Sequence, residues 1–336
     1  MPWKGETDPY KIWLSEIILQ QTRVEQGWNY YNRFIETFPN IKKLAKAPQE
    51  TVFKLWEGLG YYTRCKNLIA TAKFIATERQ GKFPHTYEDI LKLKGVGPYT
   101  AAAIGSFAFN LPYAVVDGNV FRVLARFFGM DTPIDSNTGK KMFTALAEDL
   151  LDKKKPGIYN QAIMDFGAVV CKPQNPLCGS CPLQTNCNAL ATGRREVLPV
   201  KEGKLVKRTR WFYYIIAGHS GKVYVRKRGA KDIWENLYEF ILLEAEKMLS
   251  LAELQQTPAF KKIAGKHTIE VLAESKMYRQ LLTHQTIHGR FIQIKAKNGL
   301  VLADHKEVGP KALFKLPFPK FINSFLAENE LKAFER

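Results

Sequence analysis

The sequence contains no apolar run long enough to cross a lipid bilayer. Even the apolar stretch at residues 14–19 is interrupted by Glu16, whereas a spanning helix needs about 20 such residues. The first ten residues also have no apolar core of the kind that a signal peptide requires. These absences argue against a membrane or secreted protein. A membrane partner could only be peripheral, and we expect the chain to act in the cytoplasm.

Cysteine is scarce, with five in 336 residues, yet four of the five fall within residues 171–187. The four are Cys171, Cys178, Cys181 and Cys187, in the order C-x6-C-x2-C-x5-C. Four thiolates this close together predict a metal site, and their spacing suits tetrahedral zinc as well as an iron–sulfur cluster. Two disulfides would need an oxidising compartment, which does not fit the missing signal peptide. Cys65 lies apart in a predicted helix, where a lone cysteine is usually a small buried hydrophobe.

Acidic residues are outnumbered in this chain. It has 50 Lys and Arg against 32 Asp and Glu, which gives a formal net charge of +18. The excess is spread along the sequence rather than confined to a tail. It favours a polyanionic partner, because each phosphate that is neutralised releases condensed counterions. The alternative is a merely soluble basic protein.

The length and a hydrophobic content of 46% predict two domains, because 336 residues exceed the size at which one core usually stops growing. Up to about residue 190, apolar residues recur at helical spacing, which predicts an all-α region. These segments are 10–24, 27–38, 49–57, 64–79, 86–92, 99–109, 119–128 and 138–152.

The second half of the chain has a different pattern. Residues 194–210 lose the helical periodicity and are rich in Lys and Arg, as in a basic connector. Beyond them the sequence predicts an α+β region, because β-branched and aromatic runs alternate with helical patterns. The predicted strands are 211–217, 222–226, 276–283 and 290–294, and the predicted helices lie near 247–256 and 318–334.

Residues 93–100, Leu-Lys-Gly-Val-Gly-Pro-Tyr-Thr, join an amphipathic segment to an Ala-rich helix that begins near Pro98. The Gly-x-Gly predicts a tight hairpin between two helices. Because Gly95 and Gly97 have no Cβ, backbone N–H groups at the start of the second helix can approach a phosphate oxygen. Such a contact would position a nucleic acid without reading its sequence. A lone Gly-x-Gly is more often an ordinary turn.

Two carboxylates are candidates for acid–base chemistry. Glu16 lies in a helix that is apolar around almost its whole circumference, so desolvation should raise its pKa, as a general acid near neutral pH requires. Asp117 lies in a polar Asp-Gly-Asn triplet between apolar residues, which should keep it charged. One protonated and one ionised carboxyl form the pair that cleavage of a glycosidic bond requires. Taken singly, a Glu at the rim of a helix and an Asp that caps one are the simpler interpretations.

Several features together resemble the adenine DNA glycosylases of the MutY type, in the helix-hairpin-helix superfamily that also contains endonuclease III. They are Leu-Ser-Glu-Ile-Ile-Leu-Gln-Gln-Thr at 14–22, Gly-Leu-Gly-Tyr-Tyr at 58–62, the hairpin at 93–99, Val-Asp-Gly-Asn-Val at 116–120 and the four cysteines. The resemblance runs in order from residue 2 to about residue 190. A second resemblance, to the Nudix-like C-terminal domain of that family, rests on Asp-Ile-Trp-Glu-Asn-Leu-Tyr-Glu-Phe at 232–240.

The resemblance implies a multidomain protein. We expect an all-α helix-hairpin-helix glycosylase domain at 1–193 with an iron–sulfur loop at 171–187, a basic connector at 194–210, and an α+β Nudix-like mismatch-recognition domain at 211–336. It further implies that Cys171, Cys178, Cys181 and Cys187 bind a 4Fe-4S cluster with a structural, DNA-positioning role. The chain begins almost at Trp3, without the short helical segment that usually precedes this Trp, so we expect a native start further upstream.

The implied substrate is adenine mispaired with 8-oxoguanine or guanine in duplex DNA, flipped out because its glycosidic bond cannot be reached within the stack. By the resemblance, Glu16 protonates adenine at N7 and Asp117 stabilises the oxocarbenium-like sugar or bonds to it transiently. Tyr99 and Asn119 match pocket residues that orient these groups. The simpler interpretations are packing on the hairpin for Tyr99 and helix capping for Asn119.

Three further residues match DNA-contacting positions of the family. Gln21 and Tyr61 match residues that wedge into the base stack around 8-oxoguanine. His288 closes a segment at 284–288 that stands about where the family has a Phe-Ser-His loop that reads 8-oxoguanine, with Thr286 and Ile287 replacing the usual pair. We expect a monomer that is associated with the nucleoid if its source is bacterial.

Three other functions fit parts of this sequence pattern. An endonuclease III-like enzyme that removes oxidised pyrimidines and cuts the backbone needs an amine, and where such enzymes carry lysine this chain has Tyr99. We therefore predict a monofunctional glycosylase. Nudix-type pyrophosphate hydrolysis needs an Arg-Glu-x-x-Glu-Glu run that the sequence lacks. An iron–sulfur DNA-binding protein without enzyme activity remains possible only if Glu16 and Asp117 do not converge.

Overall fold

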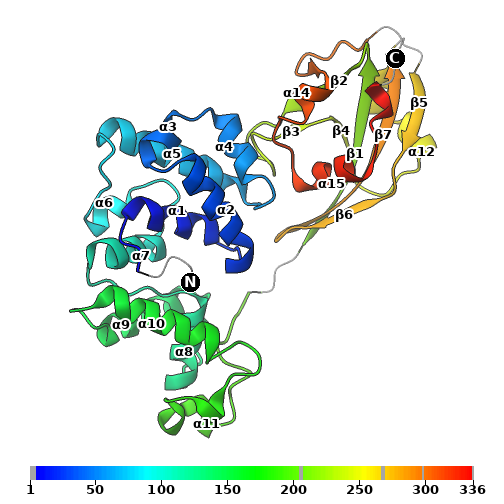
Figure 1. Cartoon of the computed structure of the whole chain (residues 1–336). Helices are drawn as coiled ribbons and strands as arrows, with labels where there is room; N and C mark the ends of the chain where they lie inside the picture. Colours follow the sequence, from blue (N-terminus) through cyan, green and yellow to red (C-terminus); the bar gives the residue numbers. More distant parts are fainter. Residues whose placement is uncertain (1–4, 204–206, 266–268, 297–298, 335–336) are drawn as a thin grey trace. The chain divides into compact units, whose positions relative to one another are not determined.

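The computed structural model of the chain describes residues 5–203, 207–265, 269–296 and 299–334, so Trp3 lies outside the described residues. The chain divides into two compact units (Figure 1). The first consists of Met1–Lys46 and Lys66–Lys204, and the second of Ala47–Cys65 and Leu205–Arg336. Residues 47–65 therefore group with the C-terminal part of the chain, although the sequence analysis places them in the helical half. The predicted domain boundaries stay a prediction.

The first unit is built from helices, as expected for an all-α region. Its helices are α1 (Pro9–Leu19), α2 (Val24–Thr37), α3 (Ile41–Lys46), most of α5 (Tyr62–Glu78), α6 (Tyr87–Leu91), α7 (Pro98–Phe109), α8 (Gly118–Phe128), α9 (Asn137–Leu150), α10 (Pro156–Val169) and the short α11 (Asn188–Ala191). The sequence analysis did not name α3 or α10. Among the described residues no helix has both the length and the apolar character that crossing a membrane requires.

Helix α1 is enclosed by protein. The Asp8 side chain caps it by accepting a hydrogen bond from the Tyr10 backbone N–H, and Pro9 occupies its first turn. Trp13, Leu14 and Ile18 are fully buried, because α1 packs against both α2 and α7. The small side chains of α7 allow this close approach.

A separate core lies beneath α8. There Val120, Leu124 and Ala125 of α8 pack with Phe143 of α9 and Met164 of α10. Helix α8 ends at Gly129, which takes the left-handed conformation common after a helix C-terminus.

The second unit contains a mixed sheet of eight strands, which confirms the expected α+β architecture. The strands are β1 (Arg208–His219), β2 (Lys222–Lys227), β3 (Tyr238–Glu239), β4 (Ile241–Ala245), β5 (Ile269–Glu274), β6 (Tyr278–Leu281), β7 (Gln285–Ala296) and β8 (Lys306–Val308). The main order is β3-β2-β1-β7-β5, with β4 paired to β1, β6 to β7 and β8 to β2. Strands β1 and β7 run parallel from Arg208↔Gln285 to Gly218↔Lys295. The Nudix-like assignment of this part stays a prediction.

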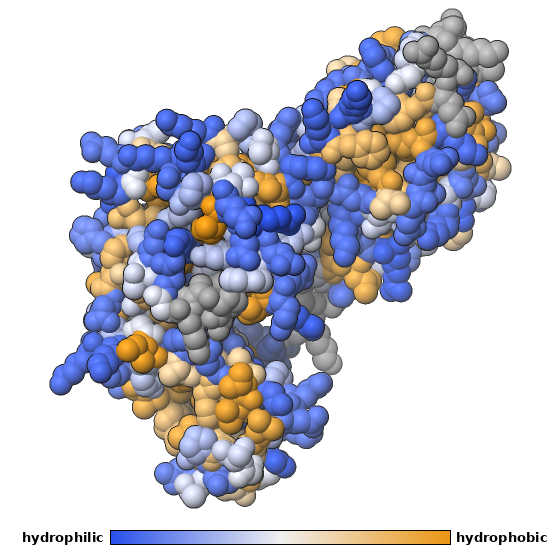
Figure 2. Space-filling model, in the orientation of Figure 1, coloured by the Kyte–Doolittle hydropathy of each residue, from blue (hydrophilic) through white to orange (hydrophobic). Residues whose placement is uncertain are grey.

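Both faces of β1 are buried, which explains its long apolar run. Tyr213 and Ile215 pack toward α12 (Leu251–Gln256) and α13 (Pro258–Ala264). Tyr214, on the other face, stacks on Phe291 of β7, and Phe291 stacks on Phe325 of α15 (Lys320–Glu328). The remaining helices are α4 (Gln49–Trp56) and α14 (Pro310–Leu313). On the face shown in Figure 2, hydrophilic residues cover most of the surface and apolar residues form smaller patches.

Candidate active site

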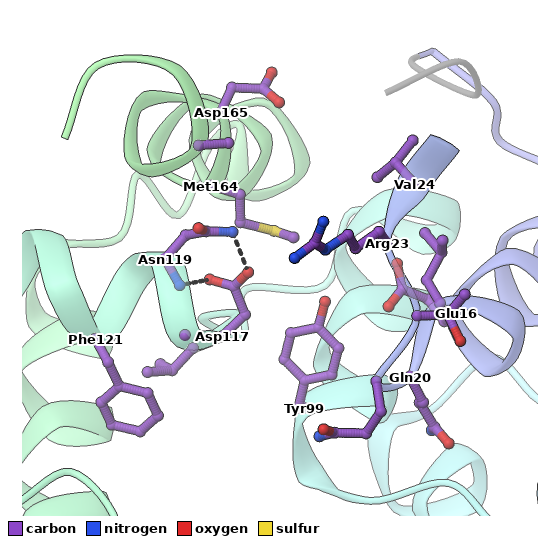
Figure 3. Close-up of a pocket in the computed structure, with 16 residues that line it drawn as sticks. Glu16, Gln20, Arg23, Val24, Tyr99, Asp117, Asn119, Phe121, Met164 and Asp165 are labelled. Atoms are coloured by element: carbon purple, nitrogen blue, oxygen red, sulfur yellow. Dashed lines mark hydrogen bonds between the residues drawn. The ribbon is translucent and has the colours of Figure 1, made fainter. Parts of the chain in front are cut away.

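A pocket of about 500 Å³ in the first unit brings together the four residues predicted to be catalytic. Glu16 of α1 and Tyr99 of α7 form one wall, and Asp117 and Asn119 at the start of α8 form the other (Figure 3). Met164 on α10 also lines the pocket. The volume lies within the range of small-molecule sites and is large enough for a purine base.

Glu16 is 4% exposed and therefore largely removed from water. Burial raises its pKa to about 7, while a hydrogen bond from Tyr99 lowers it and the nearby charge of Asp117 raises it further. The expected direction is thus confirmed. Near neutral pH this carboxyl can carry a proton and also release it, as a general acid must.

Asp117 is the N-cap of α8 and accepts three hydrogen bonds. Its Oδ1 accepts from the backbone N–H groups of Asn119 and Val120, both at 2.8 Å, and its Oδ2 accepts from Asn119 Nδ2 at 2.7 Å. Burial nevertheless raises the pKa of Asp117, with these hydrogen bonds and Arg122 acting against the increase. We expected the polar neighbours to keep this carboxyl ionised. The polar neighbours thus oppose the effect of burial on this pKa, and an ionised Asp117 stays a prediction.

The Asn119 amide is held in one orientation. Its Oδ1 accepts a hydrogen bond from Arg122 Nη2 at 2.9 Å, which leaves Nδ2 to face Asp117. Arg122 in turn donates to the backbone oxygens of Gly167 and Cys171, both at 2.7 Å. A chain of hydrogen bonds therefore leads from the pocket to the first cysteine of the 171–187 loop.

Tyr99 lies between the two carboxylates. Figure 3 shows its ring with Glu16 on one side and Asp117 on the other. Burial, together with the two nearby carboxylates, raises the pKa of the phenol well above its ordinary value. The hydroxyl therefore stays protonated and acts as a hydrogen-bond donor to Glu16.

The Gly-x-Gly hairpin joins α6 to α7 as expected. Gly95 has a φ of +80°, and a Cβ there would lie 2.8 Å from the Asn67 Cβ, so glycine is required. Gly97 is the N-cap of α7 with no side chain to cap it, and the space beside it is open. The hairpin backbone is thus accessible to a ligand.

Gln21 and Tyr61 share an unusual backbone conformation. Their φ values are 59° and 47°, in the left-handed region that non-glycine residues rarely adopt. Gln21 lines the pocket, just after α1 ends. Tyr61 is 47% exposed and belongs to the second unit, where its hydroxyl is hydrogen-bonded to Thr283.

His288 lies in a strand rather than in the loop that we expected. Strand β7 already begins at Gln285, so the turn after β6 comprises residues 282–284. Thr286 and Ile287 are buried, and the His288 ring stacks on Trp211 with centroids 4.5 Å apart. The predicted loop at 284–288 is therefore wrong, whereas a DNA contact by His288 stays a prediction.

The four clustered cysteines line a second cavity in the first unit, whose other lining is largely apolar. None of the five cysteines forms a disulfide in the structure, which gives the two-disulfide alternative no support. Arg126 donates to Cys171 Sγ at 3.6 Å and binds the Lys172 backbone oxygen at 2.6 Å, which holds the start of the loop. Within the described residues, no three His, Cys, Asp or Glu side chains are grouped closely enough to bind one metal ion. Cys65 is buried, as expected.

The sequence analysis missed two charged residues of the pocket. Arg23 precedes α2, and Figure 3 shows its guanidinium between the two walls. Asp165 of α10 accepts a hydrogen bond from Gln161 Nε2 at 2.9 Å. No pattern in the sequence marks α10 as part of the pocket, since its place there depends on how it packs against α7 and α8.

Comparison with known proteins identifies the family of the helical part of the chain. Residues 14–151 match the family described as HhH-GPD superfamily base excision DNA repair protein. A solved thermostable thymine-DNA glycosylase is similar, with a TM-score of 0.53, 31% sequence identity, and coverage of 57% of this chain and 88% of that one. A solved endonuclease III bound to DNA has a TM-score of 0.50 at 24% identity, which shows the fold alone. The fold of the first unit is that of a helix-hairpin-helix DNA glycosylase of base-excision repair.

Sequence relatives identify the branch of this superfamily. The adenine DNA glycosylase of Buchnera aphidicola subsp. Baizongia pistaciae is 37% identical over 242 residues, which are 71% of this chain and 68% of the relative. The adenine DNA glycosylase of Rattus norvegicus is 42% identical over 211 residues, which are 59% of this chain and 41% of the relative. The chain belongs to the adenine DNA glycosylases, which are hydrolytic N-glycosylases.

Proposed function

We propose that the protein removes adenine from duplex DNA in which adenine is mispaired with 8-oxoguanine or guanine. The observation that carries this proposal is the pair of carboxyls, the buried Glu16 and the half-buried Asp117, on opposite walls of one pocket that is large enough for a flipped base. A carboxyl with a pKa near 7 can donate a proton to a leaving base. A second carboxylate can stabilise the cationic sugar that remains.

In this mechanism the flipped adenine enters with its N7 toward Glu16. Proton transfer from Glu16 to N7 turns the base into a neutral leaving group, and the electrons of the glycosidic bond move into the purine ring. The positive charge that develops on the sugar is stabilised by Asp117, or Asp117 bonds to C1′ transiently. Water then adds to C1′, displacing Asp117 where it has bonded there, and gives its proton to the Glu16 carboxylate, which leaves an abasic site, free adenine and a protonated Glu16.

Tyr99 and Asn119 orient the two carboxyls. Tyr99 donates a hydrogen bond to Glu16, which leaves the remaining carboxyl oxygen to carry the transferred proton. Asn119 Nδ2 donates to Asp117 Oδ2, and Arg122 prevents the amide from rotating away. Both carboxyls are thereby aimed before the substrate arrives, which lowers the reorganisation needed during the reaction.

We infer that the enzyme is monofunctional. Strand cleavage by a lyase mechanism needs an amine that forms a Schiff base with the sugar. No lysine lines the described pocket, and the cation that does line it is Arg23, whose guanidinium is not a useful nucleophile. Borohydride trapping should therefore give no covalent protein–DNA adduct.

Residues other than the four predicted to be catalytic would hold the DNA. The hairpin backbone, which is open beside Gly97, would bind a phosphate, while Gln21 and Tyr61 would enter the base stack that the adenine has left. His288, although it lies in a strand, is only partly buried and stays a candidate for contact with 8-oxoguanine. The sheet-containing C-terminal part would thus supply mismatch recognition, and the protein would act as a monomer.

The four cysteines of the 171–187 loop would bind a 4Fe-4S cluster. Four thiols around one apolar cavity, with Arg126 next to Cys171 to balance negative charge, fit the donor set of such a cluster. When bound, the cluster would stabilise the loop rather than react with substrate. Protein purified without oxygen should be brown and contain iron, and stoichiometric zinc with negligible iron would contradict the assignment.

A glycosylase assay tests the proposed function directly. Duplexes with adenine opposite 8-oxoguanine, guanine, cytosine or thymine are incubated with enzyme and then treated with alkali to reveal abasic sites. We expect release of adenine opposite 8-oxoguanine and guanine, and little opposite the other two. Equal release from all four duplexes, or strand cleavage before alkali, would contradict the proposal.

A further inference from the structure

Three side chains on or next to α4 bind the C-terminal part of the second unit. Glu50 accepts a hydrogen bond from the Tyr238 hydroxyl at 2.5 Å, and Lys54 Nζ donates to the Leu316 backbone oxygen at 3.1 Å. Glu57, the C-cap of α4, accepts from the Phe318 backbone N–H at 2.8 Å. We call Glu50, Lys54 and Glu57 the α4 clamp.

The partners of the α4 clamp are held firmly. The Tyr238 ring is 5% exposed, its hydroxyl also accepts from Lys306 Nζ at 3.1 Å, and its backbone N–H donates to the Pro317 oxygen at 2.8 Å. Lys54 and Glu57 form an ion pair at 2.9 Å. The clamp therefore binds both sides of Pro317, through Leu316 and Phe318.

The turn after α4 is held by two hydrogen bonds and leads to Tyr61. Trp56 Nε1 donates to the Gly60 oxygen at 3.0 Å, and the Gly58 N–H donates to the Tyr62 hydroxyl at 3.3 Å. Gly58 and Gly60 have φ values of 98° and 75°, which only glycine adopts without strain. A change in the position of α4 would therefore be transmitted to Tyr61 rather than absorbed by the turn.

We propose that the α4 clamp sets the position of Tyr61, so that the C-terminal part of the chain controls mismatch discrimination indirectly as well as through any contact with DNA. Glu50, Lys54 and Glu57 are positioning residues, since Tyr61 is the group that meets the DNA. The proposal rests on the proposed role of Tyr61. In this proposal the C-terminal part affects discrimination by holding α4 in place. That role does not require any residue of the C-terminal part to contact a base.

The test is a double-mutant cycle in the full-length protein. Tyr238→Phe removes the hydroxyl that binds Glu50 and keeps the buried ring, and Glu57→Gln weakens the second contact. The readout is the ratio of single-turnover rates on adenine opposite 8-oxoguanine and opposite guanine, measured in the wild-type and the Tyr61→Ala background. Tyr278→Phe is the matched control, because its hydroxyl also binds a carboxylate, Glu328, at 3.0 Å in the same unit.

We expect Tyr238→Phe to lower the ratio about threefold and the double variant to lower it roughly tenfold, as loss of one and of two hydrogen bonds would. In the Tyr61→Ala background the same changes should have no further effect, and Tyr278→Phe should leave the ratio unchanged. A merely structural role would lower the melting temperature and leave the ratio unaltered. If the double variant does not fold, Tyr238→Phe alone decides the question.

Each of the following results would overturn the inference. Clamp variants with an unchanged ratio, or effects that add fully to that of Tyr61→Ala, would show that the clamp does not act through Tyr61. An equal loss in Tyr278→Phe would show a general effect of altering this part of the chain. A wild-type enzyme with no preference, or one whose preference survives Tyr61→Ala, would overturn the proposed role of Tyr61 and this inference with it.

Discussion

Each of the two walls of the pocket carries one carboxyl, buried in Glu16 and half-buried in Asp117, and the surroundings of the two carboxyls differ. Glu16 lies in a helix of apolar side chains and receives one side-chain hydrogen bond, from Tyr99. Asp117 lies at the start of a helix, where three N–H groups donate to it and Arg122 is nearby. Both carboxyls are desolvated, so the number of donors that reach each one separates their chemistry. The wall with one donor suits an acid, and the wall with several suits a stabilising anion.

The largest expected effect comes from removing the proton donor. Glu16→Gln preserves the volume and the Tyr99 contact but cannot donate a proton, so the single-turnover rate should fall by about 10³-fold or more. Binding to the mispaired duplex, measured by fluorescence anisotropy, should be retained. A variant that keeps most of its activity would assign the acid to another residue.

Asp117→Asn should reduce the single-turnover rate by about 10²- to 10³-fold, because a neutral amide stabilises the cationic sugar poorly. Asparagine caps helices about as well as aspartate, so the melting temperature should change little. Asp117→Ala is the control for capping and should lower stability by about 1 kcal/mol. If Asp117→Asn retains more than about a tenth of the rate, the second wall does not stabilise the sugar electrostatically.

The environment of Glu16 can be predicted from the sequence better than the environment of Asp117. A helix with apolar residues on every face must be buried, so the raised pKa of Glu16 follows from local pattern. The raised pKa of Asp117 does not follow from local pattern, because the desolvation of this carboxyl depends on the surrounding tertiary structure. That structure includes Met164 on α10, which lines the same pocket. The local sequence predicts the three hydrogen-bond donors at the start of the helix. It does not predict which parts of the protein surround the carboxyl and desolvate it.

The errors in the C-terminal part have the same origin. The start of β7 at Gln285 is set by parallel pairing with β1, whose residues lie more than 70 positions earlier, and no glycine or proline marks the turn at 282–284. The grouping of residues 47–65 with this part depends on the Lys54–Leu316 and Glu57–Phe318 contacts, which span 262 and 261 positions. Contacts at such separations leave no periodic signal in the sequence.

The burial of Glu16 should be measurable as a loss of stability. Its pKa is about 7 in the folded state and ordinarily 4.5, so the folded state holds more protons between these values. Stability from this group therefore falls as the pH rises from about 4.5 to 7, by on the order of 3 kcal/mol. Glu16→Gln removes that cost and should melt a few degrees higher than wild type at pH 8, with little difference at pH 5. Equal melting temperatures at pH 8 would show that Glu16 ionises without penalty.

The smallest expected effect comes from removing the Tyr99 hydroxyl, which donates a hydrogen bond to the acid Glu16. Tyr99→Phe removes the hydrogen bond that lowers the pKa of Glu16, so that pKa should rise further. Because catalysis needs the protonated form, the alkaline limb of the single-turnover pH profile should move to higher pH, by about half to one unit. At pH 7 the rate should fall only about tenfold, since the acid remains and only its orientation is lost. Phenylalanine keeps the aromatic ring in place, so a shift of the alkaline limb of the pH profile would be due to loss of the Tyr99 hydroxyl alone. A limb that moves to lower pH would mean that Tyr99 stabilises the protonated carboxyl, and the contrast between the two walls would then lie in burial rather than in their donors.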